Sequence, residues 1–219
     1  MTSSPPPPPR ATRAGIAEAV LEVLSERGAD ALSVRNVAAA AGVSVGAVQH
    51  HFPTRAALVT GAMDAVTAGF RARLSTALTD VDSAPRRLEV FCAELAALGD
   101  AGRRDAVVWT AFASRAGTDP DVREIHRREW ALTEAGLQAL LAAAYPDAGI
   151  DADDAGLVLA VLDGIAVARG AEGDERMSPG RGRRLIDATL AHFATRRGGR
   201  PAVTPPVEGA GLADEGRLG

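Results

Sequence analysis

Hydrophobic positions follow a helical repeat along most of this chain. Between residues 11 and 27, Ile16, Val20 and Leu24 recur at every fourth position, and Gly28 follows where a helix would stop. Few stretches alternate apolar and polar residues with the period of two that a half-buried strand requires. The pattern therefore predicts an all-α fold that begins with a helix over residues 11–27.

Two short helices separated by a tight turn are predicted next. Ser33 stands where an N-cap belongs, and the alanine-rich segment 34–41 that follows it ends at Gly42. Ser44 can cap a second short helix that runs through His51. Two short helices joined by a glycine turn are what a helix-turn-helix requires, because the start of the second helix is then free to enter a DNA groove.

The rest of the chain keeps the helical period, and its ends do not. Pro53 stops the second short helix, and Thr54 can cap the next one. Six helices are predicted from there on, separated by breaks near residues 82–85, 99–102, 117–120, 145–151 and 173–180. Residues 1–10 are proline-rich and residues 198–219 are rich in glycine and proline, so we expect two disordered tails.

Composition narrows the class of protein. Of the 219 residues, 47% are hydrophobic, enough to build a core, and only 4% are aromatic. The chain carries 24 basic and 28 acidic residues, so it is not polybasic overall. Its single cysteine, Cys92, cannot form an intrachain disulfide; we expect a buried thiol, with a redox sensor as the alternative. The most apolar run, 156–168, is too short to span a bilayer. We expect a cytoplasmic protein without membrane contact, cofactor or metal.

The outward face of the second short helix suits DNA. From residue 31 to residue 60 the only charged residues are Arg35 and Arg55, which favours a polyanion as the partner. The amide of Gln49 can pair with both polar edge atoms of adenine, so Gln49 is the candidate for reading a base. The expected DNA contacts are Arg35, Ser44, Val45, Gly46, Gln49, His50, Thr54 and Arg55.

Residues 35–59, RNVAAAAGVSVGAVQHHFPTRAALV, resemble the DNA-binding motif of the tetracycline-repressor (TetR) family of bacterial regulators. In that family the helix after the turn reads the major groove, and a hydrophobe with "FP" and a basic residue locks it to the fourth helix; here these are Phe52, Pro53 and Arg55. The family usually has tyrosine at the position of Gln49 and lysine at that of Arg55. The first departure concerns base preference, and the second keeps the positive charge.

The resemblance also implies an organisation for the whole chain. A DNA-binding domain would occupy residues 11–57, and a helical effector-binding and dimerisation domain residues 58–197. LDGIAVA, residues 162–168, is similar to a pattern in the family's eighth helix, so residues 156–171 and 179–197 would form a homodimer interface. A dimer implies a palindromic operator, and an unidentified small molecule held among the helices would release it.

A ligand pocket could use the larger hydrophobic side chains of the second domain, although each could equally be plain core. The candidates are Phe91, Leu95, Trp109, Phe112, Trp130 and Tyr145.

Three other functions compete with a ligand-released repressor. An activator would have the same fold, because the sign of regulation depends on where the operator lies. A helical adaptor without DNA binding would explain the dimer helices but not the acid-free motif. An enzyme would need a site such as His126 with Glu129, one helical turn apart, and that spacing alone is a weak signal, so we expect no enzyme.

Overall fold

The computed structural model describes residues 12–99 and 102–196; the tails expected at 1–10 and 198–219 lie outside the described residues. The described residues form helices and connections without a strand, which confirms the all-α prediction. The helices are α1 (Arg13–Arg27), α2 (Val34–Ala41), α3 (Val45–His51), α4 (Arg55–Ala77), α5 (Ala84–Leu95), α6 (Gly102–Ala116), α7 (Pro120–Ala144), α8 (Ala152–Glu172), α9 (Asp174–Met177) and α10 (Pro179–Thr195). Short 3-10 turns occupy Ala29–Ala31 and Pro146–Ala148.

The six long helices predicted after Thr54 are confirmed as α4, α5, α6, α7, α8 and α10. The short helix α9 was not predicted, because its four residues lie inside the glycine-containing break between α8 and α10. Proline at the first turn of α7 and of α10 follows capping Asp119 and Ser178, whose side chains accept backbone hydrogen bonds. Within the described residues no helix is long and apolar enough to cross a membrane.

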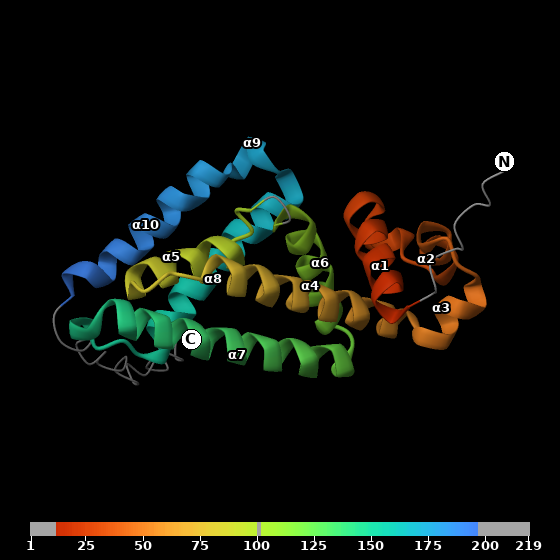
Figure 1. Ribbon diagram of the computed structural model, residues 1–219, viewed down its shortest axis with the longest axis horizontal. Helices are drawn as coiled ribbons and strands as arrows, with labels where there is room; N and C mark the ends of the chain where they lie inside the picture. The colour runs from red at the N-terminus through yellow and green to blue at the C-terminus, as the bar shows by residue number, and fades with distance from the viewer. Residues whose placement is uncertain (1–11, 100–101, 197–219) are drawn as a thin grey trace, which may run out of the picture.

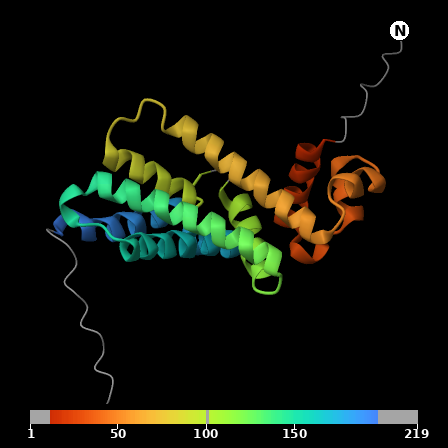
Figure 2. The same ribbon diagram turned by 90° about the horizontal axis from the view of Figure 1, so that it is seen from below.

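The molecule has a small head and a larger bundle that share one long helix. Helices α1, α2 and α3 gather at one end, and α5 to α10 form the bundle at the other (Figure 1). Helix α4 starts in the head and runs into the bundle, as the view from below shows (Figure 2). Its 23 residues span about 34 Å. The domain boundary expected at residues 57 and 58 falls inside this helix, so the division stays a prediction.

Helix α6 contributes to the core of the head and also packs against the bundle. One cluster combines buried residues of α1 to α4 with Val108, Phe112 and Ala116 of α6. A second cluster joins α5, α7, α8 and α10 around Leu88 and Leu137. Because α6 packs against α1, α4, α7 and α8, a displacement in the bundle has a packed route to the head.

Candidate DNA-binding surface and ligand cavity

Three side-chain caps define the helix-turn-helix. The hydroxyl oxygen of Ser33 accepts a hydrogen bond from the backbone N–H of Asn36 at 3.2 Å, and that of Ser44 accepts one from Ala47 at 3.1 Å. Thr54 does the same for Ala57 at the start of α4. Between α2 and α3 the chain turns at Gly42, whose φ of 65° is a left-handed conformation that glycine adopts without strain. The predicted caps and turn are confirmed.

The end of α3 is fastened to α4 by Phe52. This side chain is fully buried, and its ring lies directly over Gly61 of α4, where any side chain would collide with it. Arg13 of α1 covers the same ring, with its guanidinium carbon 4.6 Å from the ring centroid. Arg13 Nη1 also donates to the His51 carbonyl oxygen at 3.3 Å, and Nη2 lies 3.6 Å from Asp64. Helix α3 is therefore held from both α1 and α4.

Every residue expected to contact DNA lies on the surface of the head. The exposed set is Arg35, Ser44, Val45, Gly46, Gln49, His50, Thr54 and Arg55. Val48 of α3 points inward and is fully buried, so α3 has one packed face and one open face. Together with its neighbours on α2 and at the start of α4, this face presents arginine, amide, hydroxyl and imidazole groups, and the exposed set contains no carboxylate. A surface of this kind can meet phosphates and the polar edges of bases.

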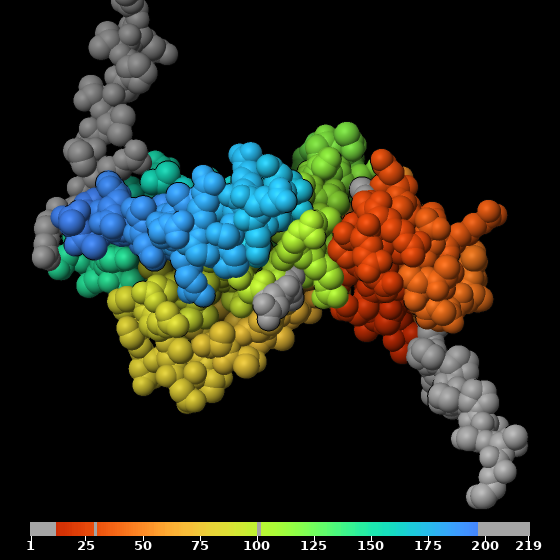
Figure 3. Space-filling view, turned by 90° about the horizontal axis from the view of Figure 1, so that it is seen from above, coloured from red at the N-terminus to blue at the C-terminus, as the bar shows by residue number. Residues whose placement is uncertain are grey.

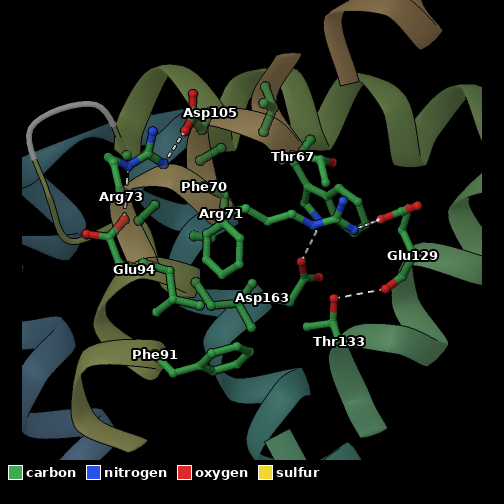
Figure 4. Close-up of a pocket in the computed structure, with 18 of the residues that line it drawn as sticks. Thr67, Phe70, Arg71, Arg73, Phe91, Glu94, Asp105, Glu129, Thr133 and Asp163 are labelled. Atoms are coloured by element: carbon green, nitrogen blue, oxygen red, sulfur yellow. Dashed lines mark hydrogen bonds and ion pairs between the residues drawn. The ribbon is translucent and has the colours of Figure 1, made fainter. Parts of the chain in front are cut away.

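The bundle contains a cavity of about 320 Å³ among α4, α5, α6, α7 and α8 (Figure 4). Three of the six candidates, Phe91, Leu95 and Trp109, line it. Phe112 does not, because its fully buried ring belongs to the core that α6 shares with the head. Trp130 and Tyr145 also lie outside the lining and pack against the bundle core.

The cavity carries more charge than its aromatic residues suggested. Arg73 joins two carboxylates at one end, through Nε to Glu94 at 3.0 Å and through Nη2 to Asp105 at 2.6 Å. Burial raises the pKa of Asp105 above its ordinary value, and the hydrogen bond from Arg73 opposes this. At the other end Arg71 Nη2 lies 3.7 Å from Glu129 (Figure 4). Sequence reasoning missed these residues because nothing local shows that their helix faces meet.

Asp163 differs from the other three carboxylates of the cavity, because its partner is a tryptophan N–H and not an arginine. It lies on α8 inside the most apolar run of the chain, and its Oδ1 accepts a hydrogen bond from Trp109 Nε1 at 2.7 Å. An acidic residue inside an otherwise apolar run is costly to bury, and this is the feature of the sequence that could have identified Asp163 as a functional position. On its other side, the Trp109 ring stacks on His126, with centroids 4.9 Å apart, and the Trp130 ring lies parallel to both.

The structure places His126, the enzyme candidate, and Cys92, the redox candidate, in environments that do not favour these roles. His126 lies half-buried in the tryptophan stack, and desolvation lowers its pKa, while its helical neighbour Glu129 is ion-paired with Arg71 and Arg128. They do not share a site. Cys92 is fully buried, and burial raises the pKa of its thiol to about 12, so it stays protonated. This confirms the buried thiol and argues against the redox sensor.

An ionic connection runs from the cavity wall to the head. Asp105, which binds Arg73 inside the cavity, lies 3.9 Å from Arg104 Nε. Arg104 Nη1 in turn lies 3.3 Å from Glu18 of α1. The cavity wall thus touches α1 through side-chain charges as well as through the shared apolar core.

Comparison with known proteins agrees with this architecture. Residues 12–62 match the family model "Bacterial regulatory proteins, tetR family", and residues 84–195 match "BetI-type transcriptional repressor, C-terminal". Over 111 residues the chain is 33% identical to the HTH-type transcriptional regulator PksA of Bacillus subtilis (strain 168). That match takes in 50% of this chain and 54% of PksA, so the chain spans about half the length of this curated relative.

Solved structures extend the similarity over most of the chain. A transcriptional regulator from Rhodococcus sp. Rha1 is 34% identical with a TM-score of 0.73, covering 83% of this chain and 95% of its own. The multidrug binding protein EbrR, solved with imidazole, is 27% identical with a TM-score of 0.56, covering 81% of this chain and 88% of its own. With both parts of the chain matched by family models, this protein belongs to the tetR family of bacterial transcriptional regulators.

Proposed function

We propose that the chain acts in the bacterial cytoplasm, where DNA lies, as a homodimeric repressor that a small molecule releases from a palindromic operator. The observation that carries this proposal is α3: a capped helix with an acid-free open face, held on its other face by Phe52 and Arg13. The matched BetI-type repressor region supports repression rather than activation.

Each expected DNA contact would have a role set by its chemistry. Gln49 would pair with a base, and the guanidinium groups of Arg35 and Arg55 would neutralise phosphates. Ser44 and Thr54 stand at the starts of α3 and α4, where free backbone N–H groups and the helix dipole favour a phosphate. The remaining contacts would come from His50 and from the small surface of Val45 and Gly46, which allows close approach.

The dimer would form through α8 and α10. Between residues 157 and 171 the exposed positions of α8 make a stripe of small and apolar residues, namely Leu157, Ala160, Gly164, Val167 and Ala171. Leu157 is 53% exposed and Val167 38%, and an added Cβ at Gly164 would meet no atom within 4 Å. Leu185 of α10 adds another exposed apolar side chain, on the helix coloured blue in Figure 3. A second copy of this chain would bury the stripe and let two α8 helices approach closely.

The cavity would hold the effector. Its wall includes residues of α4 and α6, which also build the core of the head, so a ligand there can favour one orientation of the heads over another. The similarity to EbrR, which was solved with imidazole, supports a small organic ligand. The ligand does not need to reach DNA, because it needs only a different affinity for the two orientations.

The test is selection of bound duplexes from a random library by the full chain, repeated at two salt concentrations. The proposal predicts a palindromic consensus and binding that falls steeply with salt, because phosphate contacts release counterions. Binding without an enriched sequence would contradict an operator. No binding at either salt concentration would favour an adaptor without a DNA role.

A further inference from the structure

We propose that the cavity selects an organic cation with an apolar or aromatic body, held by the Asp163 carboxylate and the aromatic rings around it. This inference rests on the proposed effector site and names the chemical class of its ligand.

The lining has an excess of negative charge. Two arginines, Arg71 and Arg73, face four carboxylates, those of Glu94, Asp105, Glu129 and Asp163, which gives a formal charge of −2. In a partly enclosed space with apolar walls such an excess attracts cations and disfavours anions. The apolar majority of the lining requires that the ligand also carry an apolar body.

The arginines of the cavity are already engaged by carboxylates. Arg73 binds Glu94 and Asp105 together, and Arg71 pairs with Glu129, which Arg128 also approaches at 3.2 Å. At Arg73 an anionic ligand would have to displace a carboxylate before it could bind, and at Arg71 it would meet the carboxylate of Glu129, which lies 3.7 Å from Nη2. At both ends of the cavity the positive charge is therefore offset by a neighbouring carboxylate.

The negative charge of Asp163 is the one that a cationic ligand can pair with. The described residues supply it no ion pair, and its hydrogen-bond donor is the neutral Trp109 N–H on Oδ1. A carboxylate has about four lone-pair sites, so most of its accepting capacity remains open to a ligand. Figure 4 shows this carboxylate between the Arg73 and Glu129 ends, on the side of the Phe70 and Phe91 rings. A cation here would neutralise a partly buried negative charge.

Aromatic rings from three helices complete the site. Phe70 of α4 and Phe91 of α5 pack edge to face, with centroids 6.0 Å apart and planes at 82°, and Trp109 of α6 joins them in the lining. The negative face of an aromatic ring attracts ammonium groups, most strongly in tryptophan. A volume of about 320 Å³ lies at the small end of the range for ligand pockets, which fits a compact cation.

The experiment titrates the full chain, without DNA, with benzyltrimethylammonium, with its neutral carbon isostere neopentylbenzene and with the anion 3-phenylpropanoate. Trp109 is one of only two tryptophans in the chain, so intrinsic fluorescence reports binding, and calorimetry confirms the affinities. We expect the cation to bind at least tenfold more tightly than the isostere and the anion not to bind. Equal binding of cation and isostere, or tighter binding of the anion, would overturn the proposal.

Asp163→Asn removes the charge and keeps an oxygen that can accept from Trp109. This variant should lose at least tenfold in affinity for benzyltrimethylammonium and keep its affinity for neopentylbenzene. The control Asp82→Asn removes the same charge from an exposed position outside the cavity and should leave both affinities unchanged. Unchanged cation affinity in folded Asp163→Asn protein, checked by circular dichroism, would refute the assignment.

Phe91→Leu gives an independent test that leaves the carboxylate intact. It should lower the affinity for the cation more than the affinity for the isostere, since leucine keeps apolar contact but has no ring face. These measurements need no operator, so their failure is distinct from failure of the proposed regulator. If the cation binds through Asp163 and selected DNA is not released, the ligand class stands and release by this ligand fails. If DNA is bound and no probe cation enters the cavity, this inference alone is wrong.

Discussion

Replacing Gly61 by alanine should loosen the fastening of α3. A Cβ built on Gly61 would lie 2.9 Å from Phe52 Cζ and nearer still to Cε1, and the fully buried ring has little room to move. Overpacking of this kind costs typically about 1 to 3 kcal/mol. Alanine recovers about 1 kcal/mol of helix propensity, so we expect a net destabilisation of about 1 kcal/mol. Phe52 is the C-cap residue of α3, so displacement of its ring should shift α3. Affinity for operator DNA should therefore fall about threefold or more.

Urea denaturation and titration of a selected duplex measure the two effects. Gly136→Ala, within α7, is the control, because its new Cβ would meet no atom within 4 Å. That variant should gain stability or stay neutral. Phe52→Leu in the Gly61→Ala background should reduce the penalty, since leucine lacks the colliding ring atoms. If Gly61→Ala stabilises the protein as its control does, the packing argument is refuted.

The remaining predictions concern DNA, the dimer and acid stability. Gln49→Ala should lose about 1 to 3 kcal/mol of binding free energy at the best duplex and relax sequence preference, and full discrimination in filter-binding titrations would refute this role. Arg55→Ala should weaken binding to all duplexes similarly and lower the salt slope by about one, and an unchanged slope would refute a phosphate contact. Leu157→Glu should yield a folded monomer in sedimentation velocity and weaken operator binding at least tenfold, and a persistent dimer would contradict the interface. The Arg196 hydrogen bond, at 2.7 Å, lowers the pKa of Asp154, so this pair stabilises the fold above pH of about 4 and is lost as pH falls through the lowered value. Asp154→Asn should therefore cost about 2 to 3 kcal/mol at pH 7 and much less at pH 3 in thermal unfolding, and an equal cost at both would exclude the linkage.

The helix-turn-helix could be predicted because its determinants are local. Ser44 lies three residues from the N–H that it caps, and Gly42 needs only its own φ to make the turn. Periodicity likewise placed the long helices, whose breaks contain glycine or proline. Arg13 escaped prediction because its partner His51 is 38 residues away, beyond the reach of any local pattern.

The cavity could be predicted only in part, since it depends on which helix faces meet. Aromatic residues are equally suited to core and pocket, so nothing in the sequence separates Trp109, which lines the cavity, from Phe112, which packs toward the head. The partners Trp109 and Asp163 lie 54 residues apart on α6 and α8. Only the packing of the bundle brings them together, and with them the charge that distinguishes this cavity from plain core.

Site-directed cleavage of a selected duplex would show whether a dimer presents two α3 helices to DNA. Cys92 is buried and protonated, so an iron chelate would attach to a single cysteine introduced by Ala39→Cys, at an exposed position of α2 outside the proposed contacts. Ala77→Cys, at the far end of α4, is the control and should give no cleavage. We expect two cleavage clusters from Ala39→Cys, related by the symmetry of the palindrome and separated by one DNA turn, ~34 Å, or a multiple of it. A single cluster, uniform cleavage or strong cleavage from the control would contradict a dimer that presents two α3 helices to DNA.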